Sequence, residues 1–265
     1  MSADSYFRRQ GADIAYQFSG SGSGPAVGYA HGVLLSRAAV RDLHLLDIDG
    51  AAHGRRLLTY DQRGHGRSTG RPIVDDYRFD NFSRDLLGLM DFVGIEEPTD
   101  FVGSSLGCDV ALRSSIAAPH RFRRLVLMIP PVAWESGPGS AQHWYVDAAD
   151  AIESAGPDAW IDHWAHSDPP AIFADYPEFG FTPDVPHSLL APILRGIGLS
   201  DLPAPEAIAT LRHPTLILAW DTDPLHPVST ARTLHNLIPD SMLHVSSSVE
   251  DVRTWTERIA AFLAI

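Results

Sequence analysis

The chain of 265 residues, 45% hydrophobic and 20% charged, has enough apolar side chains to fill one large packed core. Its formal net charge of −13 repels phosphate backbones and anionic lipid headgroups, so we expect neither nucleic acid nor a membrane among its partners. The single cysteine, Cys108, excludes an internal disulfide, and residues 1–10 lack the pattern of a secretion signal, so we expect a cytoplasmic protein.

Short apolar segments alternate with amphipathic ones along the chain. Strands are predicted at 13–18, 25–30, 56–61, 99–104, 124–130, 214–220 and 241–246, and helices at 36–48, 80–93, 106–118, 228–237 and 250–264. The later strands are short and apolar, which is typical of strands buried on both faces of a sheet. This order of elements predicts an α/β fold with a mostly parallel, doubly wound sheet covered by helices on both faces.

One long segment, 133–212, separates two buried strands that a single helix could join. A connection of about eighty residues must have structure of its own. It is rich in aromatic residues: Trp134, Trp144, Trp160, Trp164, Phe173, Tyr176, Phe179 and Phe181. We therefore expect a cap over the carboxyl edge of the sheet, with residues 1–132 and 213–265 as the core. The aromatic side chains should roof an apolar pocket, with Trp134 near its base.

The segment Gly103-Ser104-Ser105-Leu106-Gly107 fits the G-x-S-x-G pattern of a nucleophile elbow, between a predicted strand and a predicted helix. A nucleophile on such a tight turn needs glycine on either side, because any other side chain would block the close approach of the backbone. The pattern predicts Ser105 as the nucleophile, since Ser104 occupies the variable position. The alternative is an ordinary glycine-rich turn.

A second loop, His31-Gly32-Val33, directly follows the strand at 25–30. Acyl-transfer enzymes with a strand-elbow-helix arrangement take one oxyanion donor from this place and the other from the residue after the nucleophile. The predicted oxyanion hole therefore consists of the backbone N–H groups of Val33 and Leu106. We expect His31 and Gly32, together with Trp134 of the cap, to contact the substrate. The alternative is that His31 and Gly32 merely turn the chain.

Two further segments are LLTYDQRGHGRSTG at 57–70 and LILAWDTDPLHPVST at 216–230. Together with the HGV and GSSLG segments, they resemble the α/β-hydrolase superfamily, particularly its esterase, lactonase and C–C-bond hydrolase branch. The resemblance covers the core from residue 25 to the last helix and leaves the cap unassigned. It implies that the loop carrying Asp61 and His65 is a structural turn near the site.

The resemblance also implies the position of the catalytic acid. In the family the acid follows the penultimate strand in the pattern G-x-x-D-x-x-x-P. This chain matches the pattern with Trp220 in place of the glycine and Asp223 as the acid. Asp221 is the second candidate, although a role in closing the loop by hydrogen bonding suits it better.

The chain departs from the family at the general base. Family members carry a histidine on the loop after the last strand, but here His244 lies inside the predicted strand and no histidine follows it. Glu250 or Asp251 occupies the expected place, and a carboxylate could accept a serine proton only if its pKa were strongly raised. The histidines that could substitute are His226, three residues after Asp223, and four in the cap: His143, His163, His166 and His187.

Two functions are consistent with this set of residues. The first is hydrolysis of an ester, thioester, lactone or similar carbonyl of an apolar or aromatic small molecule through Ser105, with an atypical triad and slow turnover. The second is a ligand-binding protein, or a substrate-assisted isomerase or cyclase, that uses the same pocket without hydrolysis. The chain has no Cys or His pair at metal-ligand spacing, so we expect no cofactor. Its oligomeric state stays open.

Overall fold

A computed structural model describes residues 4–135, 140, 143–180 and 182–264. Its centre is an eight-stranded sheet with the strand order β1-β2-β4-β3-β5-β6-β7-β8. The strands are β1 (Ser5–Arg9), β2 (Ala12–Ser19), β3 (Gly22–Ala30), β4 (Arg55–Tyr60), β5 (Thr99–Ser104), β6 (Phe122–Met128), β7 (Thr215–Trp220) and β8 (Ser241–Ser246). From β4 to β8 all neighbouring strands are parallel, which confirms the mostly parallel sheet.

The exception is the β1–β2 edge of the sheet, where β1 pairs antiparallel with β2 and β2 antiparallel with β4. The sequence did not predict β1, because its residues SYFRR are mostly exposed and include two arginines. An edge strand of this composition shows no apolar run, and charged side chains on such an edge discourage pairing with another chain. The sheet is therefore mixed, with its parallel part forming the centre.

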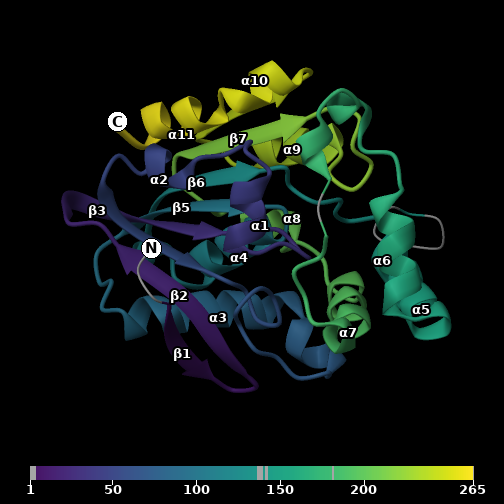
Figure 1. Ribbon diagram of the computed structural model, residues 1–265. Helices are drawn as coiled ribbons and strands as arrows, with labels where there is room; N and C mark the ends of the chain where they lie inside the picture. Colours follow the sequence, from purple (N-terminus) through teal and green to yellow (C-terminus); the bar gives the residue numbers. More distant parts are fainter. Residues whose placement is uncertain (1–3, 136–139, 141–142, 181, 265) are drawn as a thin grey trace.

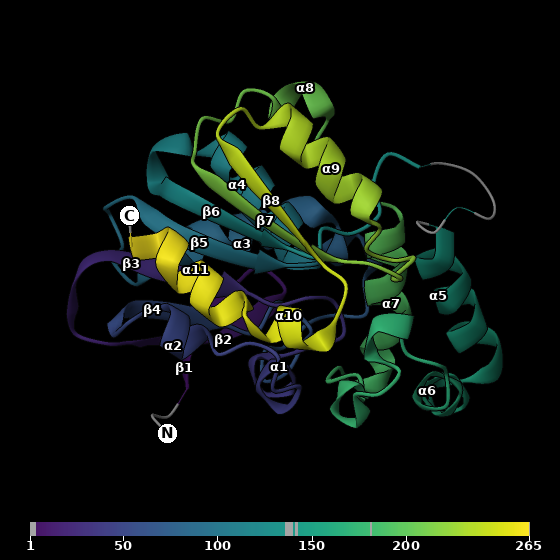
Figure 2. The same ribbon diagram turned by 90° about the horizontal axis from the view of Figure 1, so that it is seen from above.

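Helices cover both faces of the sheet (Figure 2). The core helices are α1 (Arg37–Asp42), α2 (Ile48–Ala51), α3 (Phe79–Phe92), α4 (Leu106–Ala117), α8 (Pro205–Ile208), α9 (Val228–Leu237), α10 (Val249–Arg253) and α11 (Trp255–Ala264). Short 3₁₀ turns lie at Val74–Tyr77, Pro119–Arg121, Ala171–Phe173 and Pro177–Phe179. Helices α3, α4, α8 and α9 pack on one face, and α2 and α11 on the other.

Two predicted helices end earlier or break where the sequence predicted one continuous helix. The pattern at 36–48 is correct only for α1, because the chain leaves the helix after Asp42 and turns at His44, whose φ is 52°, and α2 begins only at Ile48. The pattern at 250–264 gives α10 and α11, separated by Thr254. Both patterns have the right apolar spacing for a single helix, so periodicity alone did not reveal the breaks.

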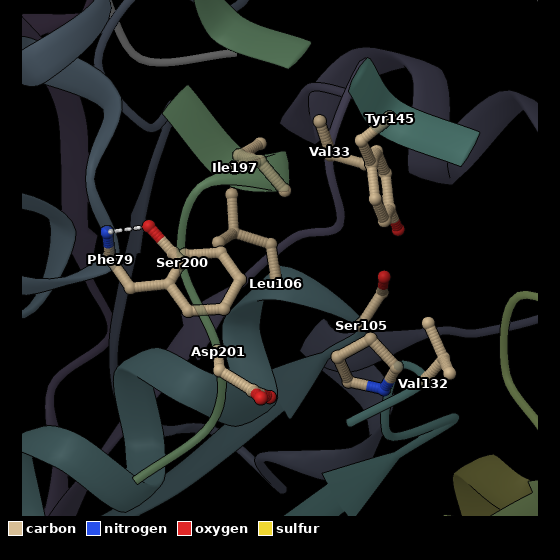
Figure 3. Close-up of a pocket in the computed structure, with 10 residues that line it drawn as sticks. Val33, Phe79, Ser105, Leu106, Val132, Tyr145, Ile197, Ser200 and Asp201 are labelled. Carbon is tan, nitrogen blue, oxygen red and sulfur yellow. Dashed lines mark hydrogen bonds between the residues drawn. The ribbon is translucent and has the colours of Figure 1, made fainter. Parts of the chain in front are cut away.

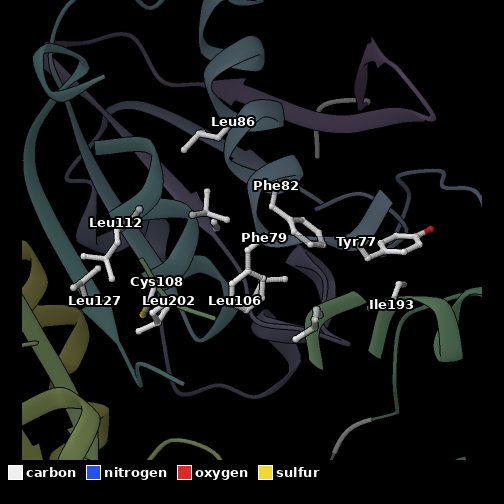
Figure 4. Close-up of a cluster of buried hydrophobic side chains, with 14 of the residues drawn as sticks. Tyr77, Phe79, Phe82, Leu86, Leu106, Cys108, Leu112, Leu127, Ile193 and Leu202 are labelled. Atoms are coloured by element: carbon white, nitrogen blue, oxygen red, sulfur yellow. The ribbon is translucent and has the colours of Figure 1, made fainter. Parts of the chain in front are cut away.

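The hydrophobic core has one part on each face of the sheet. Figure 4 shows the part between the sheet, α3, α4 and the helix α7 (His187–Gly198), where Leu86, Leu112 and Leu127 are fully buried. In α3 the buried apolar side chains recur three to four residues apart, so the helix presents one apolar stripe to the core. This packing fixes α4, whose first turn follows Ser105.

The cap region lies between β6 and β7 in the sequence, beyond the carboxyl ends of the central strands (Figure 1). Its helices are α5 (Trp144–Ala155), α6 (Pro157–Ala165) and α7 (His187–Gly198), and α5 packs against both others. These helices confirm the helical cap region that the sequence predicted. Phe181, one of the aromatic residues of the predicted cap, lies outside the described residues. Among the described residues, no helix is long and apolar enough to cross a membrane.

Candidate active site

Ser105 lies at the sharp turn between β5 and α4. Its backbone has φ 53° and ψ −113°, a conformation that L-residues avoid and that is typically maintained by surrounding structure at functional sites. The Ser105 N–H donates to the carbonyl of Met128 at 3.0 Å, which anchors the turn to the end of β6. The side chain is 4% exposed and its hydroxyl points into a small space (Figure 3).

Glycine is required on both sides of this turn. A Cβ on Gly103 would overlap the carbonyl oxygen of Gly107, and a Cβ on Gly107 would overlap the carbonyl oxygen of Ala30. The strand, the turn and the helix therefore pack backbone against backbone. This close packing gives the G-x-S-x-G segment the conformation of a nucleophile elbow rather than that of an ordinary loop.

His226 connects Ser105 to Asp223. Its Nε2 lies 2.8 Å from Ser105 Oγ, and its Nδ1 lies 2.7 Å from Asp223 Oδ2. Because an ionised carboxylate can only accept, Nδ1 carries the proton and donates it to Asp223, which leaves Nε2 to accept from the serine hydroxyl. The three side chains thus have the contacts of a nucleophile, a base and the acid that orients the base.

The β7–α9 loop supplies both Asp223 and His226 because it folds back on itself. The Leu225 N–H donates to Asp223 Oδ1 at 2.9 Å, and the His226 N–H reaches the Asp223 carbonyl at 3.3 Å. A carboxylate that accepts from the backbone two residues later forms an Asx turn. This turn brings the side chain of His226, three residues after Asp223, back to the same carboxylate. The Val132 N–H then donates to the Leu225 carbonyl at 2.9 Å and connects the loop to the segment after β6.

Asp223 is kept ionised by its neighbours. Burial alone would raise the pKa of Asp223, but the charge and hydrogen bond of His226 outweigh it, and the pKa falls to about 2. The indole N–H of Trp220 also donates to Asp223 Oδ2 at 3.2 Å. The tryptophan that replaces the family's glycine therefore holds the carboxylate.

The HGV loop lies directly against Ser105. A Cβ on Gly32 would come within 3.2 Å of the Ser105 Cβ, so this glycine permits the close approach. His31 is fully buried: its Nδ1 donates to the Gly32 carbonyl at 2.7 Å, and its Nε2 accepts from the Gln62 N–H at 2.9 Å. Burial lowers the pKa of His31, so its ring is neutral and positions the loop.

Two cavities meet at Ser105. The larger has a volume of about 1190 Å³ and runs under the cap, and Ser105, Asp223 and His226 all lie in its wall. Aromatic side chains from the cap and the core also line it: Trp144, Trp160, Trp164, Phe173, Phe179, Trp220 and Trp255. The smaller space, about 10 Å³, can hold roughly one water-sized group. It is lined by Val33, Ser105, Leu106 and Tyr145, among others (Figure 3).

Several residues singled out in the sequence lie away from Ser105. Trp134 borders neither cavity, contrary to the expectation that it lies at the base of the pocket. Its φ of 58° turns the chain, and its indole donates to the Pro203 carbonyl at 3.2 Å. His31 is fully buried within the HGV loop and lines neither cavity, contrary to the expectation that it contacts the substrate. Glu250 is exposed on α10, away from both cavities.

The other histidines have partners of their own. His244 on β8 pairs with Asp251 on α10 at 2.8 Å. In the cap, three histidines pair with nearby aspartates and are half-buried or exposed: His143, His166 and His187. His163 reaches the rim of the larger cavity but is exposed. Of the candidates for the base, only His226 contacts Ser105 in the part of the chain that the structure describes.

The loop after β4 contacts the HGV loop, since the Gln62 N–H donates to His31 Nε2. Asp61 accepts two hydrogen bonds from the Arg37 guanidinium at 3.0 Å each, so this carboxylate is paired. His65 is fully buried, and burial lowers its pKa to about 3. Asp61 is thus paired with an arginine and His65 is enclosed in the core, as expected for residues of a structural turn near the site. Among the described residues, no group of three or more His, Cys, Asp or Glu side chains could hold a metal ion.

A mostly parallel sheet with a serine on a sharp strand-to-helix turn is characteristic of the α/β-hydrolase-fold class. The family model described as alpha/beta hydrolase fold matches residues 29–251, and the chain belongs to this family. It is 30% identical to the 2-hydroxy-6-oxo-2,4-heptadienoate hydrolase of Pseudomonas putida over 72% of this chain and 70% of that protein. It is 23% identical to 3-oxoadipate enol-lactonase 1 of Acinetobacter baylyi, over 89% and 86% of the two chains.

Solved structures share the fold. The enol-lactonase from Burkholderia xenovorans LB400 superposes with a TM-score of 0.79 at 21% identity. The match covers 98% of this chain and all of that one. At this level of identity the similarity shows that the two proteins have the same fold.

Proposed function

We propose that this protein is a serine hydrolase in which Ser105, His226 and Asp223 form the catalytic triad. The observation that carries the proposal is the continuous pair of contacts, 2.8 Å from Ser105 Oγ to His226 Nε2 and 2.7 Å from His226 Nδ1 to Asp223 Oδ2. The triad is atypical because its histidine follows β7 on the same loop as the aspartate. The proposal accounts for the lack of a histidine after β8.

The reaction follows from these contacts. Ser105 Oγ attacks the substrate carbonyl carbon while its proton passes to His226 Nε2. Asp223 stabilises the imidazolium that forms. His226 then returns the proton to the leaving group, and the bond between that group and the carbonyl carbon breaks. A water molecule, deprotonated by His226, hydrolyses the acyl-enzyme in the same way.

The oxyanion donors in this proposal are the N–H groups of Val33 and Leu106. Leu106 is the first residue of α4, so its N–H has no acceptor within the helix. Gly32 brings the HGV loop against Ser105, and Val33 and Leu106 both border the small space beside it. A carbonyl oxygen there would lie near the positive end of α4.

The substrate class follows from the larger cavity. Its volume of about 1190 Å³ and its aromatic lining suit an apolar or aromatic molecule of considerable size. The relatives are named for a heptadienoate and an enol-lactone. We propose an ester, thioester, lactone or C–C bond beside a carbonyl as the bond that is cleaved. The cap that roofs the substrate lies within residues 133–212, although α8 at the end of this segment packs against the core helices α4 and α9, and the rest of the core is residues 1–132 and 213–265.

The same contacts support hydrolysis over a function in binding or rearrangement alone. A protein that only binds its ligand has no need of a histidine between Ser105 and an ionised Asp223. With a base in contact with Ser105, we propose ordinary rather than slow turnover of activated esters. The sequence alone led us to expect slow turnover, because it assigned no histidine as the base.

A fluorophosphonate probe tests the proposal. It reacts with a serine hydroxyl only when a neighbouring base activates that hydroxyl. We expect the purified protein to gain one phosphonyl group, located at Ser105 by peptide mass spectrometry, and to lose its activity toward p-nitrophenyl and naphthyl esters in parallel.

Two variants serve as matched controls. Ser105→Ala should not be labelled, whereas Ser104→Ala, with the neighbouring hydroxyl removed, should still be labelled at Ser105. Labelling at another residue, or an active enzyme that the probe does not modify, would contradict the proposal.

A further inference from the structure

Tyr145 lies in the first turn of α5 in the cap, outside the proposed triad and oxyanion hole. Its side chain is 5% exposed, and its ring packs edge-on against Trp144 with centroids 5.2 Å apart. It borders both the larger cavity and the small space beside Ser105. Figure 3 shows its hydroxyl pointing toward the hydroxyl of Ser105.

The Tyr145 hydroxyl has no hydrogen-bond partner among the residues that the structure describes. This oxygen is not among the buried unpaired polar atoms of the described residues, so it is open to the cavity, where a water molecule or a substrate group can accept its hydrogen bond. The small space is lined mostly by apolar side chains, including Val33, Leu106 and Ile197, and also by Ser200 and Asp201. The Asp201 carboxylate already accepts hydrogen bonds from the backbone N–H groups of Trp134 and Leu202. A group that enters the space from the substrate is therefore the natural acceptor for the hydroxyl.

The Tyr145 hydroxyl remains protonated. Burial raises the pKa of Tyr145 above its ordinary value, and the negative charge of Asp223 raises it further. The hydroxyl can therefore donate a hydrogen bond at neutral pH. It is a poor proton acceptor, which excludes Tyr145 as the general base.

We propose that the Tyr145 hydroxyl is a third oxyanion donor, which the cap adds to the backbone N–H groups of Val33 and Leu106. This inference rests on the proposed function. When the bond from Ser105 Oγ to the carbonyl carbon forms, the electron pair of the C=O bond moves onto the carbonyl oxygen. That oxygen lies in the water-sized space that Val33, Leu106 and Tyr145 share. Tyr145 donates a hydrogen bond to it and keeps its proton.

The test is Tyr145→Phe, which removes only the hydroxyl. Loss of one oxyanion donor typically lowers kcat by about 10²- to 10³-fold, so we expect a fall in kcat of about 10²-fold with KM nearly unchanged. A trifluoromethyl ketone, which forms an adduct with an oxyanion, should bind more weakly by a similar factor. Across a series of aryl acetates, the loss should not vary with the pKa of the leaving phenol.

Stability separates this role from a structural one. Because the hydroxyl makes no hydrogen bond to any described residue, removing it should leave the melting temperature unchanged or raise it. The matched control is Tyr77→Phe, whose hydroxyl donates to the Arg71 carbonyl at 2.8 Å in the core, away from both cavities. We expect that variant to have a lower melting temperature and an unchanged kcat.

Three results would overturn the inference. The first is a Tyr145→Phe enzyme with wild-type kcat and wild-type affinity for the ketone. The second is a loss that grows with the pKa of the leaving phenol, since this would make Tyr145 the acid for the leaving group. The third is a clear fall in melting temperature. If one of these results is obtained and the fluorophosphonate still labels Ser105, only the role of Tyr145 is wrong. If the probe does not label the unmodified protein, the proposed function itself is wrong.

Discussion

Replacing His226 with alanine should lower kcat for p-nitrophenyl esters by about 10⁴- to 10⁶-fold, the typical effect of losing the base of a serine triad. The reason is the 2.8 Å contact between His226 Nε2 and Ser105 Oγ, because without the imidazole no described side chain is in place to accept the serine proton. Steady-state kinetics with purified variants measure the effect, and circular dichroism checks the fold.

Two surface substitutions are the controls for His226→Ala. Glu250→Gln changes the carboxylate at the place where the family carries its base, and this side chain is exposed on α10. His166→Ala removes an exposed cap histidine that lines neither cavity. Both variants should keep the wild-type kcat. A large loss in Glu250→Gln together with a small one in His226→Ala would move the base to the last loop and contradict the triad described here.

Asp223→Asn should lower kcat by about 10⁴-fold, because the amide no longer fixes the proton of His226 on Nδ1. In the native protein Asp223 is ionised, with a pKa of about 2, and accepts from His226, Trp220 and the Leu225 backbone. An asparagine in this position can present its NH₂ group to Nδ1, which favours the tautomer that carries the proton on Nε2. That tautomer cannot accept the serine proton.

Asp221→Asn is the matched control for this prediction, two residues earlier on the same loop. Its backbone N–H donates to the Ser246 carbonyl at 3.1 Å, and the residue lines neither cavity. We expect its kcat to remain within about twofold of wild type. Equal losses in the two variants would indicate that the loop tolerates no substitution, and would leave Asp223 without a specific role.

The sequence predicted the sheet and the elbow well because both depend on local patterns. β7 is almost entirely apolar, β5 is buried except at Ser104, and Ser105 is flanked by Gly103 and Gly107 at the required spacing. Only the antiparallel edge strand β1, with its two arginines and mostly exposed side chains, gave no apolar signal. The parts of the fold that depend on burial in the centre of the molecule were therefore the parts that the sequence revealed.

The contact of His226 with Ser105 could not be predicted from the sequence. It depends on an Asx turn at Asp223 that reverses the loop, and on the hydrogen bond from Val132 that fixes the loop against β6. A signal was present, namely an aspartate followed three residues later by a histidine in a segment with two prolines. That spacing occurs in many surface turns, so the sequence alone gave only a list of candidates.

The departures from the family pattern belong to one region of the structure. Trp220, in place of the family's glycine, donates to Asp223, and its ring stacks on Trp255 of α11 with centroids 5.4 Å apart. The indole N–H of Trp255 donates in turn to Ser246 at the end of β8. Aromatic side chains therefore lie between the acid and the last strand.

The position of Trp134 could not be predicted from the sequence, because it depends on a backbone with positive φ that no sequence pattern indicated.

The measurement that tests the triad most directly is the turnover of the double variant Ser105→Ala/His226→Ala beside the two single variants. Triad members act as one unit, so removing the second member after the first has little further effect. We predict that the three variants have the same residual kcat within about threefold. If the losses instead multiply, so that the double variant is slower than either single variant by the full effect of the other, Ser105 and His226 act independently and the proposed triad is wrong.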